Sequence, residues 1–193
     1  IPTDDGLINI NTLNNYLENA SAIIFNSFAG YFAEQPVQEI AKICHKRGCF
    51  VIEDASGSLT DPILADGNHS DIIVASFGKW KLINVGYGGM LSTNDNELLE
   101  KISDIKTINS YPPYLPEHLF PLLNDTRRRF LLDLSKKVKK DLNEYKIFHK
   151  DKRGLNVVTE NNPFIIDYCN QNNYEYLICP KYIRINKHAI SIE

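Results

Sequence analysis

The first half of the chain alternates short apolar runs with amphipathic stretches. Four runs rich in β-branched and aromatic residues, each bounded by polar or glycine-rich sequence, predict strands: 22–26, 49–54, 71–77 and 88–93. Residues 36–48 predict a helix, because this stretch opens with a proline, carries an apolar stripe and closes with basic residues and a glycine. A shorter helix is expected at 11–20. This alternation is typical of an α/β fold, a mainly parallel sheet with flanking helices.

A different pattern follows Asn94. Residues 94–108 predict an amphipathic helix, with Glu97 three positions after Asn94 as in a capping box. Five residues that stiffen or interrupt the backbone come next: Tyr111, Pro112, Pro113, Pro116 and Pro121. We interpret residues 111–124 as a linker that follows a large-domain core at 1–110.

The last third of the sequence predicts a small C-terminal α+β domain at 125–193. Residues 125–145 form a long predicted helix with apolar side chains near one face: Phe130, Leu131, Leu134, Val138, Leu142 and Tyr145. Beyond it, one helix candidate at 163–171 is surrounded by four short strand candidates: 155–159, 174–179, 182–186 and 189–193.

Composition narrows the class of protein. The chain has 193 residues, 43% of them hydrophobic and 23% charged, which favours a globular domain over a disordered one. No apolar run is long enough to span a bilayer and no signal peptide is recognisable, so a soluble, cytoplasmic protein is expected. The four cysteines show no metal-binding or disulfide spacing, and we interpret them as buried thiols. The chain begins at Ile1 and its only methionine is Met90, which predicts that an N-terminal portion is missing.

The net charge of -3 is unevenly distributed. Residues 125–153 hold 11 basic and 5 acidic side chains, although the chain as a whole is slightly acidic. The basic helical stretch 127–140 has two interpretations, a solvated helix face or a binding surface for nucleic acid or phosphate. Its cations alternate with apolar residues on a helical period and no aromatic residues stack between them, so the solvated face is favoured.

Groups that can do chemistry collect at the ends of the predicted strands. Asp54 ends one strand, and Ser76 ends the next and is followed by Lys81. The glycines of the run 86–89 lead into the strand after that. Because ligands of open α/β sheets bind at the carboxyl ends of the strands, an acid, a hydroxyl, an amine and flexible backbone are expected to converge on one edge.

These residues carry a family resemblance. The run 22–89 resembles the large-domain core of the DegT/DnrJ/EryC1/StrS family, pyridoxal-phosphate (PLP) enzymes of the aspartate aminotransferase fold that mostly aminate nucleotide-linked keto-sugars. Glu53-Asp54 matches the E-D signature of the family, and Ser76, Phe77 and Lys81 match its S-F-x-x-x-K run. The K-x-x-x-x-G-x-G-G pattern is matched by Lys81 with Gly86, Gly88 and Gly89.

The resemblance implies a role for each of three residues. Asp54 would pair with the pyridine nitrogen of PLP and keep it protonated, which strengthens the ring as an electron sink. Lys81 would form the Schiff base and then act as acid and base. Ser76 would bind the phosphate. The implied enzyme is an aminotransferase that uses an amino-acid donor such as glutamate and a small-molecule keto-sugar as substrate, and it acts as a homodimer.

Departures from the family pattern support a competing hypothesis. Gly57 stands where the family usually has glutamine, Ser27 and Gly78 where it usually has histidine, and Tyr87 where it has glutamate. The N-terminal phosphate cup and the ring-stacking aromatic residue of the family have no counterpart in this chain. A degenerate, non-catalytic relative that binds a partner therefore stays open beside the enzyme.

The sequence offers other candidates for the site and for the class of protein. Lys79 is a rival to Lys81 for the cofactor. Arg184 is either a structural residue or a ligand for a substrate carboxylate. The five histidines form no metal-ligand spacing, so no metal site is expected. A phospho-receiver domain is disfavoured, because its lysine should lie two strands further along the chain.

Overall fold

A computed structural model describes residues 1–103, 115–181 and 184–193. The chain divides into two compact units. The first unit comprises residues 1–9, 28–35 and 126–193, and the second comprises 10–27 and 36–125. Part of the predicted linker, including Tyr111, Pro112 and Pro113, lies outside the described residues, and the predicted boundaries at 110 and 125 stay a prediction. No helix among the described residues is long and apolar enough to cross a membrane.

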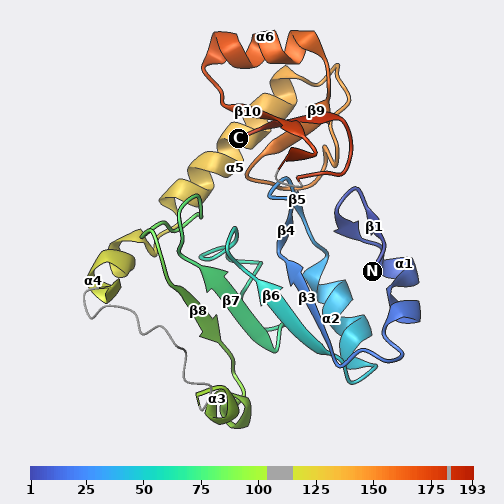
Figure 1. The fold of residues 1–193 in the computed structure, drawn as a ribbon, viewed down its shortest axis with the longest axis vertical. Helices are drawn as coiled ribbons and strands as arrows, with labels where there is room; N and C mark the ends of the chain where they lie inside the picture. The colour runs from blue at the N-terminus through green and yellow to red at the C-terminus, as the bar shows by residue number, and fades with distance from the viewer. Residues whose placement is uncertain (104–114, 182–183) are drawn as a thin grey trace. The chain divides into compact units, whose positions relative to one another are not determined.

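A four-stranded sheet forms the centre of the second unit (Figure 1). Its order is β3-β6-β7-β8, and the strands are β3 (Ala22–Asn26), β6 (Phe50–Asp54), β7 (Ile72–Ser76) and β8 (Gly89–Ser92). The first three strands run parallel and β8 is antiparallel to β7. The α/β prediction is therefore confirmed, and each predicted strand of the first half forms within its expected range.

The helices of the second unit are α1 (Ile10–Leu13), η1 (Asn14–Tyr16), α2 (Val37–His45), α3 (Asn96–Ser103), α4 (Leu115–Leu119) and η2 (Phe120–Leu122). The apolar stripe of α2 is buried, as its sequence predicts. The predicted cap of α3 is wrong by one residue. The Asp95 carboxylate, not Asn94, accepts the backbone N–H bonds of Glu97 and Leu98, because the Asn94 amide donates to the carbonyl of Gly67 instead.

The two faces of this sheet differ in burial. Side chains alternate between the faces of a strand, and on β3 Ile23 is 4% exposed whereas Ile24 is 68% exposed. The same alternation on β6 buries Glu53 and leaves Asp54 half-buried on the opposite face. The carboxyl ends of the parallel strands therefore present polar side chains on the more open face.

The first unit contains a second, antiparallel sheet of order β10-β11-β9 (Figure 1). Its elements are β9 (Val157–Glu160), β10 (Tyr176–Cys179), β11 (Ala189–Ile192), α5 (Thr126–Asp141) and α6 (Pro163–Asn172). Two short hairpins complete the unit: β1 (Thr3–Asp4) with β2 (Leu7–Ile8), and β4 (Phe28–Ala29) with β5 (Ala33–Glu34). The predicted strand at 182–186 does not form at Arg184–Asn186, and residues 182–183 lie outside the described part.

The predicted apolar face of this helix is buried at Val138 and at Leu142, just past the end of α5, but not at Phe130. Phe130 is 64% exposed, and the buried positions instead include Arg128, Leu132 and Lys139. Lys139 donates from Nζ to the carbonyl oxygens of His149 and Lys152, so a cation takes a buried place that apolar periodicity alone assigns to another side chain. Burial lowers the pKa of Lys139.

Candidate functional site

Asp54 ends β6 with its carboxylate held from two sides. The side-chain amide of Asn26, the last residue of β3, donates to Oδ2 of Asp54 over 2.7 Å. The backbone N–H of Ser56 donates to Oδ1 over 2.9 Å. Asn26 and Asp54 are register partners across the parallel pair, so the sheet itself places the amide beside the carboxylate.

Ser76 ends the neighbouring strand and is linked to the same turn. Its backbone N–H donates to Oγ of Ser56 over 2.9 Å. Its own hydroxyl accepts a 3.2 Å hydrogen bond from the backbone N–H of Gly78. Ser56 thus connects Asp54 to Ser76, and a hydroxyl and a backbone N–H lie together just past the end of β7.

Lys81 lies in a loop whose base is closed by backbone hydrogen bonds. The Phe77 N–H donates to the carbonyl oxygen of Gly88 over 2.9 Å, and the Phe77 carbonyl oxygen accepts the Val85 N–H over 3.0 Å. Within the loop, the Lys81 N–H donates to the carbonyl oxygen of Gly78 over 3.2 Å. Lys81 is half-buried. The rival Lys79 is exposed and its Nζ lies 4.8 Å from the ring centre of Trp80.

The glycines after this loop are required by backbone geometry. Gly86 and Gly88 have φ values of +89° and +83°, which L side chains rarely adopt. Gly89 begins β8 opposite Ser76, and a Cβ there would lie 2.6 Å from the carbonyl oxygen of Ala75. The glycine run therefore lets β8 pack closely against the end of β7.

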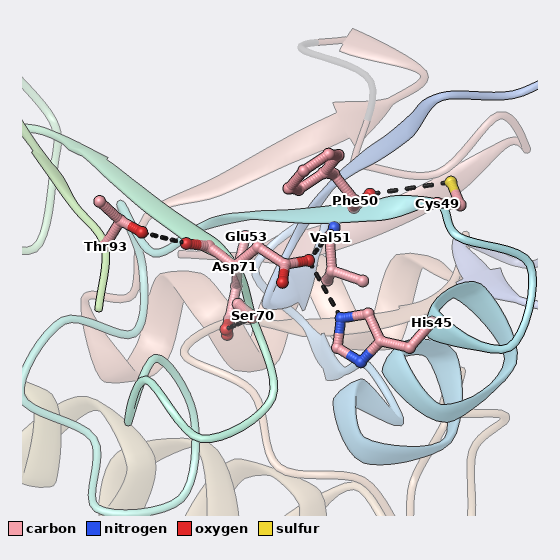
Figure 2. Close-up of polar contacts among 8 residues, drawn as sticks. All are labelled: His45, Cys49, Phe50, Val51, Glu53, Ser70, Asp71 and Thr93. Atoms are coloured by element: carbon pink, nitrogen blue, oxygen red, sulfur yellow. Dashed lines mark hydrogen bonds and ion pairs between the residues drawn. The ribbon is translucent and has the colours of Figure 1, made fainter. Parts of the chain in front are cut away.

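Glu53 forms a polar network on the buried face of the sheet. Its Oε1 accepts from the Ser27 hydroxyl over 2.6 Å and from the Ala65 N–H over 3.0 Å, and its Oε2 accepts from the Ser70 hydroxyl over 2.6 Å. Figure 2 shows Glu53 with Ser70. The two acids of the E-D signature therefore differ in role, because Glu53 holds the segment that connects β6 to β7 and Asp54 faces the open side.

Asp71 fixes the start of β7 (Figure 2). Its Oδ2 accepts the Val51 N–H over 2.7 Å and lies 3.0 Å from Nε2 of His45. Its carbonyl oxygen accepts the Thr93 hydroxyl over 2.7 Å. These bonds tie β7 to β6, to the end of α2 and to the residue after β8, so the strand that ends in Ser76 is held at both ends.

The three residues predicted for the site belong to one unit, and two of them lie at one edge of its sheet. Asp54 and Ser76 end adjacent parallel strands, and Lys81 follows Ser76 in the closed loop. Sequence reasoning missed Asn26 and Ser56. The rule that found Asp54, a polar residue at the carboxyl end of a parallel strand, applies equally to Asn26 at the end of β3.

The structure accounts for the other candidates without a ligand. Arg184 makes a two-pronged contact with Glu193, from Nε over 3.1 Å and from Nη2 over 2.8 Å, which supports its structural interpretation. The basic helix buries Arg128 and Lys139, which reduces its value as a binding surface. No cluster of metal-binding side chains occurs within the described ranges.

Comparison with known proteins gives three kinds of match. The model of the DegT/DnrJ/EryC1/StrS aminotransferase family matches residues 1–112. An uncharacterised protein of Methanocaldococcus jannaschii is 34% identical over 102 residues, which are 51% of this chain and 26% of that protein.

Solved structures share the fold at low sequence identity. Serine palmitoyltransferase of Sphingomonas wittichii has a TM-score of 0.64 at 14% identity, over 95% of this chain and 53% of that one. DndA of Streptomyces lividans has a TM-score of 0.66 at 13% identity, over 97% of this chain and 64% of that one. The chain thus spans between half and two thirds of these structures, and its fold is that of the PLP-dependent transferases.

The family and the fold indicate pyridoxal phosphate as the cofactor. The donor set at the edge fits this group. A carboxylate accepts hydrogen bonds and can pair with a protonated ring nitrogen, which is the capacity of Asp54. A primary amine can hold an aldehyde, and Lys81 supplies one. The Ser76 hydroxyl accepts the Gly78 N–H and can donate its own proton to a phosphate oxygen.

Proposed function

The chain belongs to the DegT/DnrJ/EryC1/StrS aminotransferase family, and we propose that it is a PLP-dependent aminotransferase that uses Lys81, Asp54 and Ser76. The observation that carries the proposal is their placement. Asp54 and Ser76 end register-paired strands, and the loop of Lys81 is closed by the bond between Phe77 and Gly88. An acid and a hydroxyl therefore share one sheet edge, and the loop that carries the amine begins directly after it.

Each residue has a separate task. The Asp54 carboxylate would pair with the ring nitrogen and hold a proton there. Lys81 Nζ would hold the cofactor through its aldehyde carbon, with release of water, and once displaced by the substrate amine it would move a proton to and from the substrate carbon. Ser76 Oγ would donate to the phosphate. When bound, PLP supplies the electron sink that makes the substrate carbon acidic.

The substrate proposal follows the family. The resemblance is to enzymes that mostly aminate nucleotide-linked keto-sugars, so we propose a keto-sugar as amino acceptor and an amino acid such as glutamate as donor. We also propose that two copies of the protein form the working unit. Both extensions concern the whole enzyme, whereas this chain spans 53–64% of the solved relatives described above.

A titration with PLP tests the proposed cofactor role. The protein is mixed with PLP and its visible absorbance is scanned, alongside Lys81→Ala and the matched variant Lys79→Ala. We expect the band of lysine-bound PLP in the wild type and in Lys79→Ala and its loss in Lys81→Ala. No band, or a band that survives Lys81→Ala and disappears in Lys79→Ala, would overturn the assignment.

A second measurement tests the reaction class. The PLP-loaded protein is given glutamate without an acceptor, and 2-oxoglutarate is measured. Transfer of the amino group predicts one equivalent of 2-oxoglutarate for each loaded site, and a PLP-loaded protein that releases none contradicts an aminotransferase that uses glutamate.

A further inference from the structure

The amide of Asn26 bonds directly to the proposed cofactor acid. Its Nδ2 lies 2.7 Å from Oδ2 of Asp54, and the two residues are register partners at the carboxyl ends of β3 and β6. Asn26 is exposed, so core packing does not account for its side chain. Its strand neighbour Ile24 on the same face is apolar, which makes the amide the polar group that β3 contributes to this edge.

We propose that Asn26 is a positioning residue of the cofactor site, which fixes the Asp54 carboxylate in the orientation that receives the ring nitrogen. The inference rests on the proposed function. A carboxylate offers about four lone-pair positions. Asn26 uses one on Oδ2 and the Ser56 N–H uses one on Oδ1, which leaves acceptor positions on both oxygens for a protonated ring.

The two donors divide the positioning between them. A carboxylate at a strand end can rotate about its side-chain torsions, and one hydrogen bond leaves some of that freedom. Bonds to both oxygens remove it, because the Asn26 amide and the Ser56 backbone approach different atoms of the same group. Such preorganisation strengthens binding, since the cofactor does not have to order the acid.

The Ser56 donor is a backbone group, so Asn26 is the member that substitution can test. Asn26→Leu removes the donor at similar size, and Asn26→Ser keeps a shorter one. Asn9→Leu is a matched control, because Asn9 Nδ2 makes the same kind of bond to Oδ2 of Asp4, at 2.9 Å, in the first unit. All variants are made in the full chain.

Two readouts separate positioning from a general structural effect. The first is the PLP dissociation constant from the visible absorbance, which we expect to rise about 10- to 100-fold in Asn26→Leu, the range for a hydrogen bond to a charged group. The second is the pH at which bound PLP loses its ring proton, which should fall because a misdirected carboxylate supports that proton less well. Asn26→Ser should recover part of both, and Asn9→Leu should match the wild type.

The outcomes distinguish this inference from the proposed function. If the wild type binds PLP through Lys81 and Asn26→Leu shows the same affinity and the same pH midpoint, the positioning role is wrong and the function stands. If the wild type binds no PLP, both are wrong. If Asn26→Leu has a much lower melting temperature than the wild type, the result for Asn26→Ser is used instead. The inference would be overturned if Asn26→Ser bound PLP with wild-type affinity and bound PLP lost its ring proton at the wild-type pH.

Discussion

The hydroxyl of Ser27 donates a 2.6 Å hydrogen bond to the carboxylate of Glu53, and both side chains are buried. Ser58 donates in turn to the Ser27 hydroxyl over 2.8 Å. Serine, where the family usually has histidine, is therefore small enough to lie buried within a polar network. We interpret this departure from the family motif as a structural one, because Ser27 bonds to Glu53 on the buried face of the sheet.

Glu53→Ala should destabilise the protein strongly. The change leaves the Ser27 and Ser70 hydroxyls and the Ala65 N–H without their acceptor, so we expect a loss of about 3–5 kcal/mol in unfolding free energy. Urea unfolding measures it. The exposed Glu144→Ala is the control and should stay within about 0.5 kcal/mol of the wild type. Equal effects of the two changes would mean that the network is not formed.

The alternation on β3 predicts opposite outcomes for neighbouring isoleucines. Ile23→Ala removes a side chain that is 4% exposed and should cost about 2–5 kcal/mol. Ile24→Ala removes one that is 68% exposed and should change stability by about 0.5 kcal/mol or less. Thermal or urea unfolding of both variants checks the strand register, and a larger loss for Ile24→Ala would show that the register is inverted.

Gly89→Ala should damage both the sheet and the cofactor site. The added Cβ would lie 2.6 Å from the Ala75 carbonyl oxygen, so β8 must move away from the strand that ends in Ser76. We expect a loss of about 1–3 kcal/mol in stability together with weaker PLP binding. Ser92→Ala, an exposed change on the same strand, should leave both unchanged. PLP affinity equal to the wild type in Gly89→Ala would contradict the role of this close approach.

The buried thiol of Cys44 predicts a loss of stability at alkaline pH. Burial raises the pKa of Cys44 from 9.0 to about 12 in the folded protein. The unfolded chain therefore loses this proton first, so the contribution to stability is complete below pH 9 and disappears as the pH rises toward 12. In this window Cys44 should lower the unfolding free energy by about 1.4 kcal/mol per pH unit.

Cys44→Val isolates this contribution, because it keeps a small apolar side chain and removes the titrating group. The difference in unfolding free energy between the wild type and Cys44→Val should change with pH above 9 and stay constant below it. A constant difference across the whole range would contradict a raised thiol pKa.

The sequence predicts the elements that depend on local pattern. The strands that carry Asp54 and Ser76 form as their apolar runs indicate. The rule that ligands bind at the carboxyl ends of parallel strands singles out the edge where both residues lie, and the site itself stays a prediction. The hydrogen bond from the Asn26 amide to Asp54 could not be predicted from local pattern, because it depends on the pairing of β3 with β6 and joins residues 28 positions apart.

Other differences have tertiary causes. Phe130 is exposed because Arg128, Leu132 and Lys139 set the buried face of α5, and the carbonyl partners of Lys139 lie in a loop that helical periodicity does not reveal. The α3 cap moves to Asp95 because Asn94 has a long-range partner at Gly67. In both cases a contact distant in sequence decides between local options that are nearly equivalent.

Locating the lysine that holds the cofactor tests the proposed role of Lys81. The protein is loaded with PLP, reduced with borohydride, digested and analysed by mass spectrometry for the modified peptide. We expect a single stoichiometric modification at Lys81. Modification at Lys79, or a low level spread over surface lysines, would contradict it.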